Sequence, residues 1–181
     1  MSRFEFNTVL VSIVLAFAIS EILTGWGRLI RHRGRARSAG LFVFATSWVL
    51  FAIVAHWFGF WAYRDVPFDH IVQTLLVLLP SLVIALVCFI WVPDIPAQGD
   101  FDAESHYFDS ARWTLPLIAL FLMLGVVSDL LIPSVEDWGT LVIIIPIGML
   151  LGCAFSRNRL IHFAVFGASW IVFAAAMSIS A

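Results

Sequence analysis

The sequence contains no lysine and few charged residues of any kind, and this shortage excludes most classes of soluble protein. Of the 181 residues only 12% are charged, whereas 62% are hydrophobic. Soluble domains have about 25% charged residues, and much of a small domain's surface stays in contact with water. The composition therefore argues against a nucleic-acid-binding protein, a secreted disulfide scaffold and a disordered tail. It predicts an integral membrane protein.

Cysteine and the common catalytic motifs are scarce as well. The two cysteines, Cys88 and Cys153, both fall in apolar segments and indicate no disulfide framework. The chain has no Cys-x-x-Cys-His, His-Glu-x-x-His or Gly-x-Ser-x-Gly motif. A haem would need two histidines at one depth, and only His70 could join His56 there. We therefore predict no catalytic residue, no metal site and no cofactor.

Long apolar runs are what the sequence has in abundance. About 20 apolar residues cross the hydrocarbon core of a bilayer as a helix, and the runs do not alternate as barrel strands do. We predict an all-α, polytopic transmembrane helical bundle that forms a single domain over residues 1–181. Its six predicted spans are about 8–29, 40–62, 70–92, 113–132, 139–156 and 161–180. The fifth is the shortest.

The arginines predict how this bundle is oriented. Five of the ten lie between Arg28 and Arg37, and three more are Arg112, Arg157 and Arg159. In a six-span chain these eight share one side, and arginine-rich loops stay cytoplasmic. We therefore predict both termini outside, in what we take to be a bacterial inner membrane. Tryptophans near span ends, such as Trp26, Trp91 and Trp113 inside and Trp61 and Trp138 outside, with Tyr63, predict an aromatic belt.

The longest loop, residues 93–111, is predicted to be cytoplasmic and carries five acidic residues without arginine. The spacing of Asp100, Asp102 and Glu104 is that of a calcium loop, but Ser105 replaces the glycine at position six and Ala111 the glutamate at position twelve. We predict a solvated acidic loop that faces the arginine loop on the same side of the membrane.

Glu21 is a carboxylate inside the first span. Thr24, Gly25 and Arg28 follow at offsets of three, four and seven, so the four residues share one helical face. That face fits a hydrated entry for a proton or cation. It fits equally well a structural ion pair with an arginine that reaches back from the interface.

His56 and Asp129 are the other titratable residues placed inside spans. Both are predicted in the outer half of the bundle, His56 in the second span and Asp129 in the fourth. At that depth they could form a proton-relay pair, or His56 could be a packing residue whose hydrogen bonds are satisfied. An ionisable group near the bilayer centre costs about 2.5–3.5 kcal/mol to insert and often marks function.

Small residues and prolines predict where helices pack and bend. Gly148, Gly152 and Ser156 recur every four residues in the fifth span, a pattern that lets helices approach closely within one chain or between subunits. Pro80, Pro116 and Pro146 lie inside predicted spans, where each removes a backbone donor and can kink the helix.

Three functions fit these features. The first is a channel- or transporter-like protein that moves protons, cations or a small solute, with Glu21, His56, Asp129, Thr24 and Arg28 as the relay candidates. The second is a structural or accessory subunit of a larger membrane complex. The third is an enzyme acting on lipid or quinone, for which the sequence contains no recognised set of catalytic residues. The expected partners are the lipid bilayer and a second copy or a complex subunit.

Overall fold

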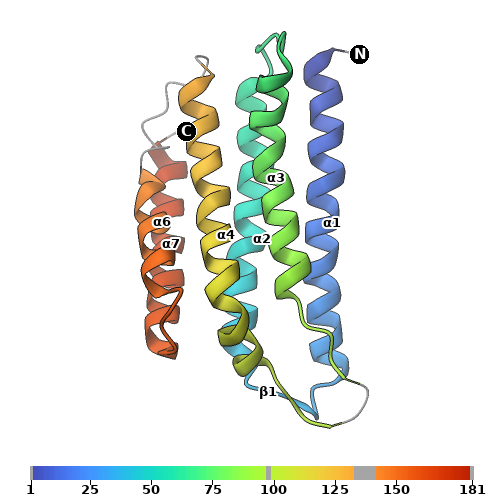
Figure 1. The fold of residues 1–181 in the computed structure, drawn as a ribbon, viewed down its shortest axis with the longest axis vertical. Coiled ribbons are helices and arrows are strands. Elements are labelled where there is room, and N and C mark those ends of the chain that lie inside the picture. The colour runs from blue at the N-terminus through green and yellow to red at the C-terminus, as the bar shows by residue number, and fades with distance from the viewer. Residues whose placement is uncertain (1, 97–98, 133–141, 180–181) are drawn as a thin grey trace.

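The computed structural model describes residues 2–96, 99–132 and 142–179, and within them the chain is almost entirely helical (Figure 1). The α-helices of these residues are α1 (Arg3–Arg31), α2 (Gly40–Gly59), α3 (Ile71–Trp91), α4 (Ala103–Leu131), α6 (Ile144–Cys153) and α7 (Arg159–Ile179). A short 3₁₀ helix, η1 (Phe60–Tyr63), extends α2. The prediction of an all-helical bundle is confirmed.

Successive helices run in opposite directions and pack in two layers (Figure 1). In one layer α1 packs on α3, α3 on α4, and α4 on α6. The second layer holds α2, which contacts α1, α4 and α7, and α7 also packs on α6. The helix α3 therefore packs between α1 and α4, whereas α1 lies at one edge of the bundle and the α6–α7 pair at the other.

Four helices are long and apolar enough to cross a membrane: α1, α2 with η1, α3 and α4. The first three match predicted spans within a few residues, apart from the start of α1. The helix α4 begins at Ala103, ahead of the fourth predicted span, so residues 103–111 of the predicted loop are helical. The Asp102 carboxylate accepts the Glu104 N–H and caps the helix, so the polar residues that follow are helical although hydropathy gives no sign of it.

The last two helices match the predicted spans less closely. The helix α6 has ten residues in the structure and ends at Cys153, not at residue 156, and the start of its predicted span, 139–141, lies outside the described residues. The helix α7 covers 21 residues. A six-span topology is therefore not established by the described helices.

The helix α1 packs on the bundle through buried residues that recur at every third or fourth position. Its buried positions are Asn7, Val11, Leu15, Ala18, Ile22, Gly25 and Leu29. This spacing places them on one helical face, which packs on α3 and α2. At Gly25 an added Cβ would lie 2.5 Å from Val92 Cγ1, so the close approach of α1 to the end of α3 requires glycine there.

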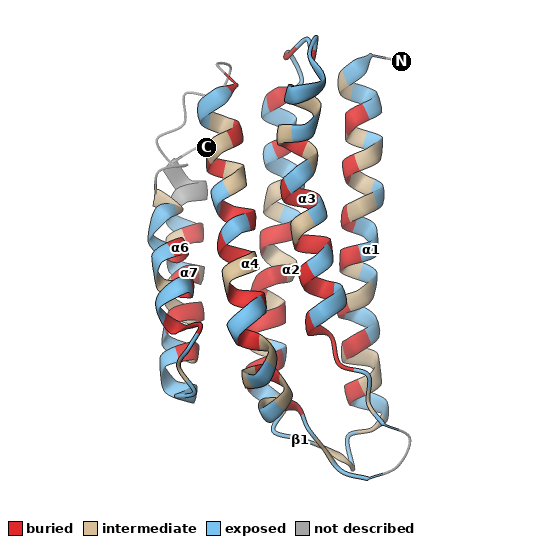
Figure 2. Cartoon of the chain, viewed as in Figure 1, coloured by how far each residue is buried: buried red, intermediate tan, exposed pale blue. Residues whose placement is uncertain are grey.

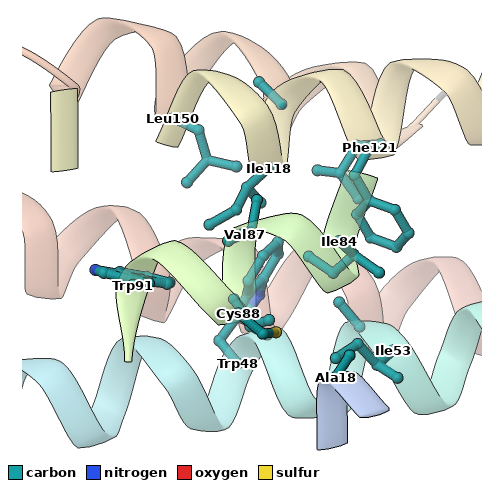
Figure 3. Packing of buried hydrophobic residues seen from close by; sticks show 14 of the residues in the cluster. Ala18, Trp48, Ile53, Ile84, Val87, Cys88, Trp91, Ile118, Phe121 and Leu150 are labelled. Atoms are coloured by element: carbon teal, nitrogen blue, oxygen red, sulfur yellow. The ribbon is translucent and has the colours of Figure 1, made fainter. Parts of the chain in front are cut away.

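The core is centred on α3 and is rich in aromatic rings. Figure 3 shows Ile84, Val87, Cys88 and Trp91 of α3 among Trp48 and Ile53 of α2 and Ile118 and Phe121 of α4. Trp91 is buried and packs edge-on against Phe42 and tilted against Tyr107. Its predicted place in an interfacial belt was wrong. Trp61 and Trp113, by contrast, are 60% and 63% exposed, while Trp138 lies outside the described residues.

We call the end of the bundle formed by residues 28–37, 93–112 and 156–159 the arginine end. There β1 (Ala36–Arg37) pairs in parallel with β2 (Phe101–Asp102). Ion pairs join the loops: Arg28–Asp94 at 2.6 Å, Arg37–Asp100 at 2.9 Å, Arg159–Glu104 at 3.4 Å, and Arg157–Asp109. The acidic loop does face the arginine loop at one end of the bundle.

The outward surface of the helices is apolar, the reverse of a soluble bundle. Figure 2 shows exposed positions along every helix, and they include Phe17 and Leu23 of α1, Leu79 and Phe89 of α3, and Ile171 of α7. Exposed apolar faces of this extent fit a lipid environment. The helices are those of a membrane-embedded protein.

Candidate functional site

The best candidate site lies between α2, α3 and α4, in the half of the bundle away from the arginine end. Here His56 of α2 lies with its Nε2 3.1 Å from the Ser81 Oγ of α3. Ser81 is fully buried, and the Phe121 ring of α4 meets the imidazole edge-on. His56 is thus a satisfied interhelical contact that keeps one titratable ring inside the bundle.

One residue before Ser81, Pro80 creates a second polar contact. Proline has no N–H, so the carbonyl four residues earlier, that of Leu76, loses its helical donor. Ser128 of α4 replaces it in part: its hydroxyl lies 2.8 Å from the Leu76 oxygen and shares its proton with the Leu124 carbonyl of its own helix, also at 2.8 Å. The predicted effect of Pro80, a freed carbonyl, is therefore present, and a neighbouring helix satisfies it.

Asp129 follows Ser128 in α4 and lies toward the end of the bundle opposite the arginine end. The Tyr63 hydroxyl of η1 donates a hydrogen bond to Asp129 Oδ1. Tyr63 is buried, and its ring packs on Phe60. We call the five residues His56, Ser81, Ser128, Tyr63 and Asp129 the polar seam.

The seam differs from the predicted His56–Asp129 pair. In the described contacts His56 is hydrogen-bonded to Ser81 and Asp129 to Tyr63, so the two titratable groups have separate partners. Sequence reasoning missed Ser81, Ser128 and Tyr63. The only sequence signal was the proline beside Ser81, which predicts a carbonyl in need of a donor without saying which helix provides it.

Glu21 lies outside the seam, on α1 toward the arginine end. Its Oε1 is 3.9 Å from Arg28 Nη1, and the same guanidinium makes the shorter contact with Asp94 and also donates to the Pro93 carbonyl at 3.3 Å. The structure thus contains the ion pair that was one of the two interpretations of Glu21.

The residues of the predicted helical face around Glu21 have different surroundings. Thr24 is exposed and lines an open groove on the outer side of α1 with Ser20 and Leu23, whereas Gly25 faces the opposite way into the contact with Val92. Offsets of three and four residues cover a wide arc of a helix, so the two residues fall on different sides of the packing boundary.

No described side chain donates to a carbonyl that Pro116 or Pro146 would leave without its helical donor. Pro116 lies inside α4. Pro146 is the third residue of α6, within the first turn, where backbone N–H groups have no helical partner in any case. A kink at Pro146 stays a prediction.

The predicted packing face of α6 points away from the rest of the described chain. Gly148 and Gly152 are exposed, and a Cβ added to either would meet nothing within 4 Å. Ser156 lies beyond the end of the helix, and its carbonyl accepts from His162 Nε2 at 2.9 Å. A packing role between copies of the chain stays a prediction.

A second buried polar cluster, which the sequence did not indicate, lies at the arginine end. The Tyr107 hydroxyl is 2.7 Å from His162 Nδ1. Because the Ser156 carbonyl can only accept, His162 Nε2 carries a proton and Nδ1 of the neutral ring accepts from Tyr107. This network ties α4 to α7 and to the turn before it.

Among the described residues no group of three or more His, Cys, Asp or Glu side chains could hold a metal ion. No family model matches the chain, and comparison with curated proteins and with solved structures gives no match either. The function is therefore argued from the geometry of this chain alone.

Proposed function

We propose that this membrane protein is channel- or transporter-like and moves protons or a small cation along a route that includes the polar seam. The observation that carries the proposal is the seam itself. It places His56 and Asp129 inside apolar helices and holds each by a hydrogen bond from another element. Ionisable groups inside membrane-spanning helices are costly to insert and commonly line ion or proton routes.

Three titratable residues stand at successive heights above the arginine end. At 1.5 Å per residue, Glu21 lies about 15 Å above the end of α1, His56 about 24 Å above the start of α2, and Asp129 about 39 Å above the start of α4. The steps between them exceed a hydrogen bond, so water molecules are part of the proposed route.

We further propose six spans, with α6 and α7 as the fifth and sixth. The 21 residues of α7 give about 31 Å, enough to cross the hydrocarbon core. The ten residues of α6 give about 15 Å, so its crossing has to begin before residue 144. With eight arginines at one end, this topology places the arginine end in the cytoplasm and both termini outside, in a bacterial inner membrane.

Flux across proteoliposomes tests the transport proposal. With a pH gradient, a potential set by valinomycin and a trapped pH dye, the wild-type protein is expected to dissipate the gradient. His56→Gln, Asp129→Asn and Glu21→Gln are each expected to slow dissipation at least about tenfold, because each removes a group that accepts and releases a proton.

Asp65→Asn is the matched control, since Asp65 is an exposed carboxylate paired with its neighbour Arg64 at 3.3 Å. It is expected to conduct like the wild type, and all variants are expected to remain folded, because Gln and Asn keep a hydrogen-bonding side chain at each position. Wild-type rates in all three variants would remove these residues from the route. A wild-type protein inert toward protons, sodium and potassium would refute transport.

A second candidate, a subunit of a larger or homo-oligomeric membrane complex, has one observation in its favour. The exposed Gly148–Gly152 face of α6 has open space before it, and small residues are what closely packed membrane helices use. Absence of flux together with a protein that co-purifies in mild detergent, and is lost in Gly152→Leu, would favour this alternative.

A further inference from the structure

The charges at the arginine end do not balance, and the imbalance is confined to particular residues. All five acidic residues of the loop have partners. Four are in ion pairs, namely Asp94 with Arg28, Asp100 with Arg37, Glu104 with Arg159 and Asp109 with Arg157. The fifth, Asp102, caps α4 by accepting the Glu104 N–H.

Four arginines at this end remain outside these ion pairs. Arg31, Arg33 and Arg112 are exposed, and no described carboxylate lies within ion-pair distance of any of them. Arg35 is different, because its guanidinium lies 2.9 Å from His32 Nδ1 and its backbone carbonyl accepts the Phe101 N–H. Three exposed arginines therefore carry positive charge that no described carboxylate neutralises.

Arg31 and Arg33 lie at the end of α1 and in the turn after it, and Arg112 lies in the third turn of α4. Arg31 is the last residue of α1, the edge helix, and follows Ile30, which is 67% exposed on the lipid-facing side. Arg33 follows in the turn. The Arg112 guanidinium lies 5.4 Å above the ring of Trp113, an exposed tryptophan of the kind found at the headgroup level.

We infer that the exposed arginines of the arginine end, Arg31 and Arg33 on α1 and Arg112 with Trp113 on α4, bind the headgroups of anionic phospholipids along this surface of the bundle. A guanidinium binds phosphate oxygens through two parallel N–H groups, and stacking on an indole leaves the edges of the Arg112 guanidinium open for that contact. The apolar neighbours Ile30 and Trp113 suit the acyl chains and the interface, so a lipid fits both parts of the surface.

The acidic loop gives this surface its selectivity. By neutralising Arg28, Arg37, Arg157 and Arg159 it holds those arginines in the ion pairs described above, and the three arginines outside the pairs are left for lipid. Each arginine near an anionic surface contributes about 1 kcal/mol, or roughly fivefold in apparent affinity. The inference depends on the membrane embedding and not on transport, so flux and lipid preference can fail independently.

The test is native mass spectrometry of the purified protein with equal amounts of phosphatidylglycerol and phosphatidylcholine. The wild-type protein is expected to retain phosphatidylglycerol at least about fivefold better. The triple variant Arg31→Gln, Arg33→Gln, Arg112→Gln is expected to lose this preference, and the corresponding three arginine-to-lysine changes are expected to keep most of it, because the charge remains.

The matched control removes three arginines from the same end that already have partners, as Arg37→Gln, Arg157→Gln, Arg159→Gln. It changes the net charge equally and is expected to keep the phosphatidylglycerol preference. Equal loss in both triple variants would show that total charge decides, and would overturn the inference, as would displacement of the lipid by equimolar inorganic phosphate. If the first triple variant does not fold, Arg33→Gln and Arg112→Gln alone carry the test, each expected to lower the preference several-fold.

Discussion

The two ends of the bundle are held together by different kinds of contact. At the arginine end, loops from three places in the chain are joined by ion pairs, a two-residue strand pair and the buried Tyr107–His162 hydrogen bond. In the other half, single polar side chains bridge helices inside an apolar core, as His56 does with Ser81.

The difference follows from the surroundings. Exposed ion pairs in water contribute little each, with a usual range of about 0–1 kcal/mol, so the arginine end needs many of them and tolerates the loss of one. A polar atom packed between helices depends on one designated partner, and removing that partner costs about 1–3 kcal/mol, so each contact of the polar seam is individually important.

The largest effect is expected from the tryptophans of the two ends. Trp91→Ala at the arginine end should lower the free energy of unfolding by about 3–5 kcal/mol, because Trp91 is 1% exposed and packs on Phe42 and Tyr107. Trp61→Ala at the other end, where the side chain is largely exposed, should change it by less than about 1 kcal/mol. Unfolding in mixed micelles measures both, and equal losses would contradict the assigned core.

An intermediate effect is expected at the proline contact. Ser128→Ala should cost about 1–3 kcal/mol, because the Leu76 carbonyl is left without a donor. In a Pro80→Ala background the helix regains its own N–H, so the same change should cost clearly less, as a double-mutant cycle would show.

Ser110→Ala is the control for that cycle, since the Ser110 Oγ contacts only carbonyls of its own helix, those of His106 and Tyr107. It should cost less than about 0.5 kcal/mol. A coupling of zero between positions 80 and 128 would refute the compensation.

The smallest effect on stability is expected from cysteines introduced at exposed positions of the two ends. These cysteines test on which side of the membrane each end lies. Arg64→Cys and Arg33→Cys replace exposed side chains at opposite ends. In intact cells a membrane-impermeant maleimide should label position 64 and not position 33, if the arginine end is cytoplasmic. The native Cys88 and Cys153 are buried and should stay unlabelled. The opposite labelling pattern would reverse the proposed orientation.

Hydropathy was sufficient to place the long helices because crossing a bilayer imposes length and apolarity together. It could not place the start of α4, because the first turns after Asp102 are helical although they are polar. The only sequence signal for these turns is the N-cap residue, Asp102. It could not distinguish Trp91 from Trp113 either. Both lie near a span end, but Trp91 points into the core and Trp113 out of it.

The candidate site was predicted in part for a similar reason. The titratable members, His56 and Asp129, are conspicuous because charge is rare inside spans. Their partners Ser81 and Tyr63 are ordinary residues whose importance depends on how one helix is rotated and shifted against the next. A single sequence has periodicity within a helix but carries no record of that relative placement.

The pairing of β1 with β2 also constrains how the molecule is made. Strand residues Ala36 and Phe101 belong to loops separated by two complete membrane helices, so the first loop waits without its partner while α2 and α3 are synthesised and inserted. Only when the second loop leaves the ribosome can this end close. The strands can therefore pair only after α2 and α3 have been made, and until then the first arginine-rich loop lacks its backbone partner.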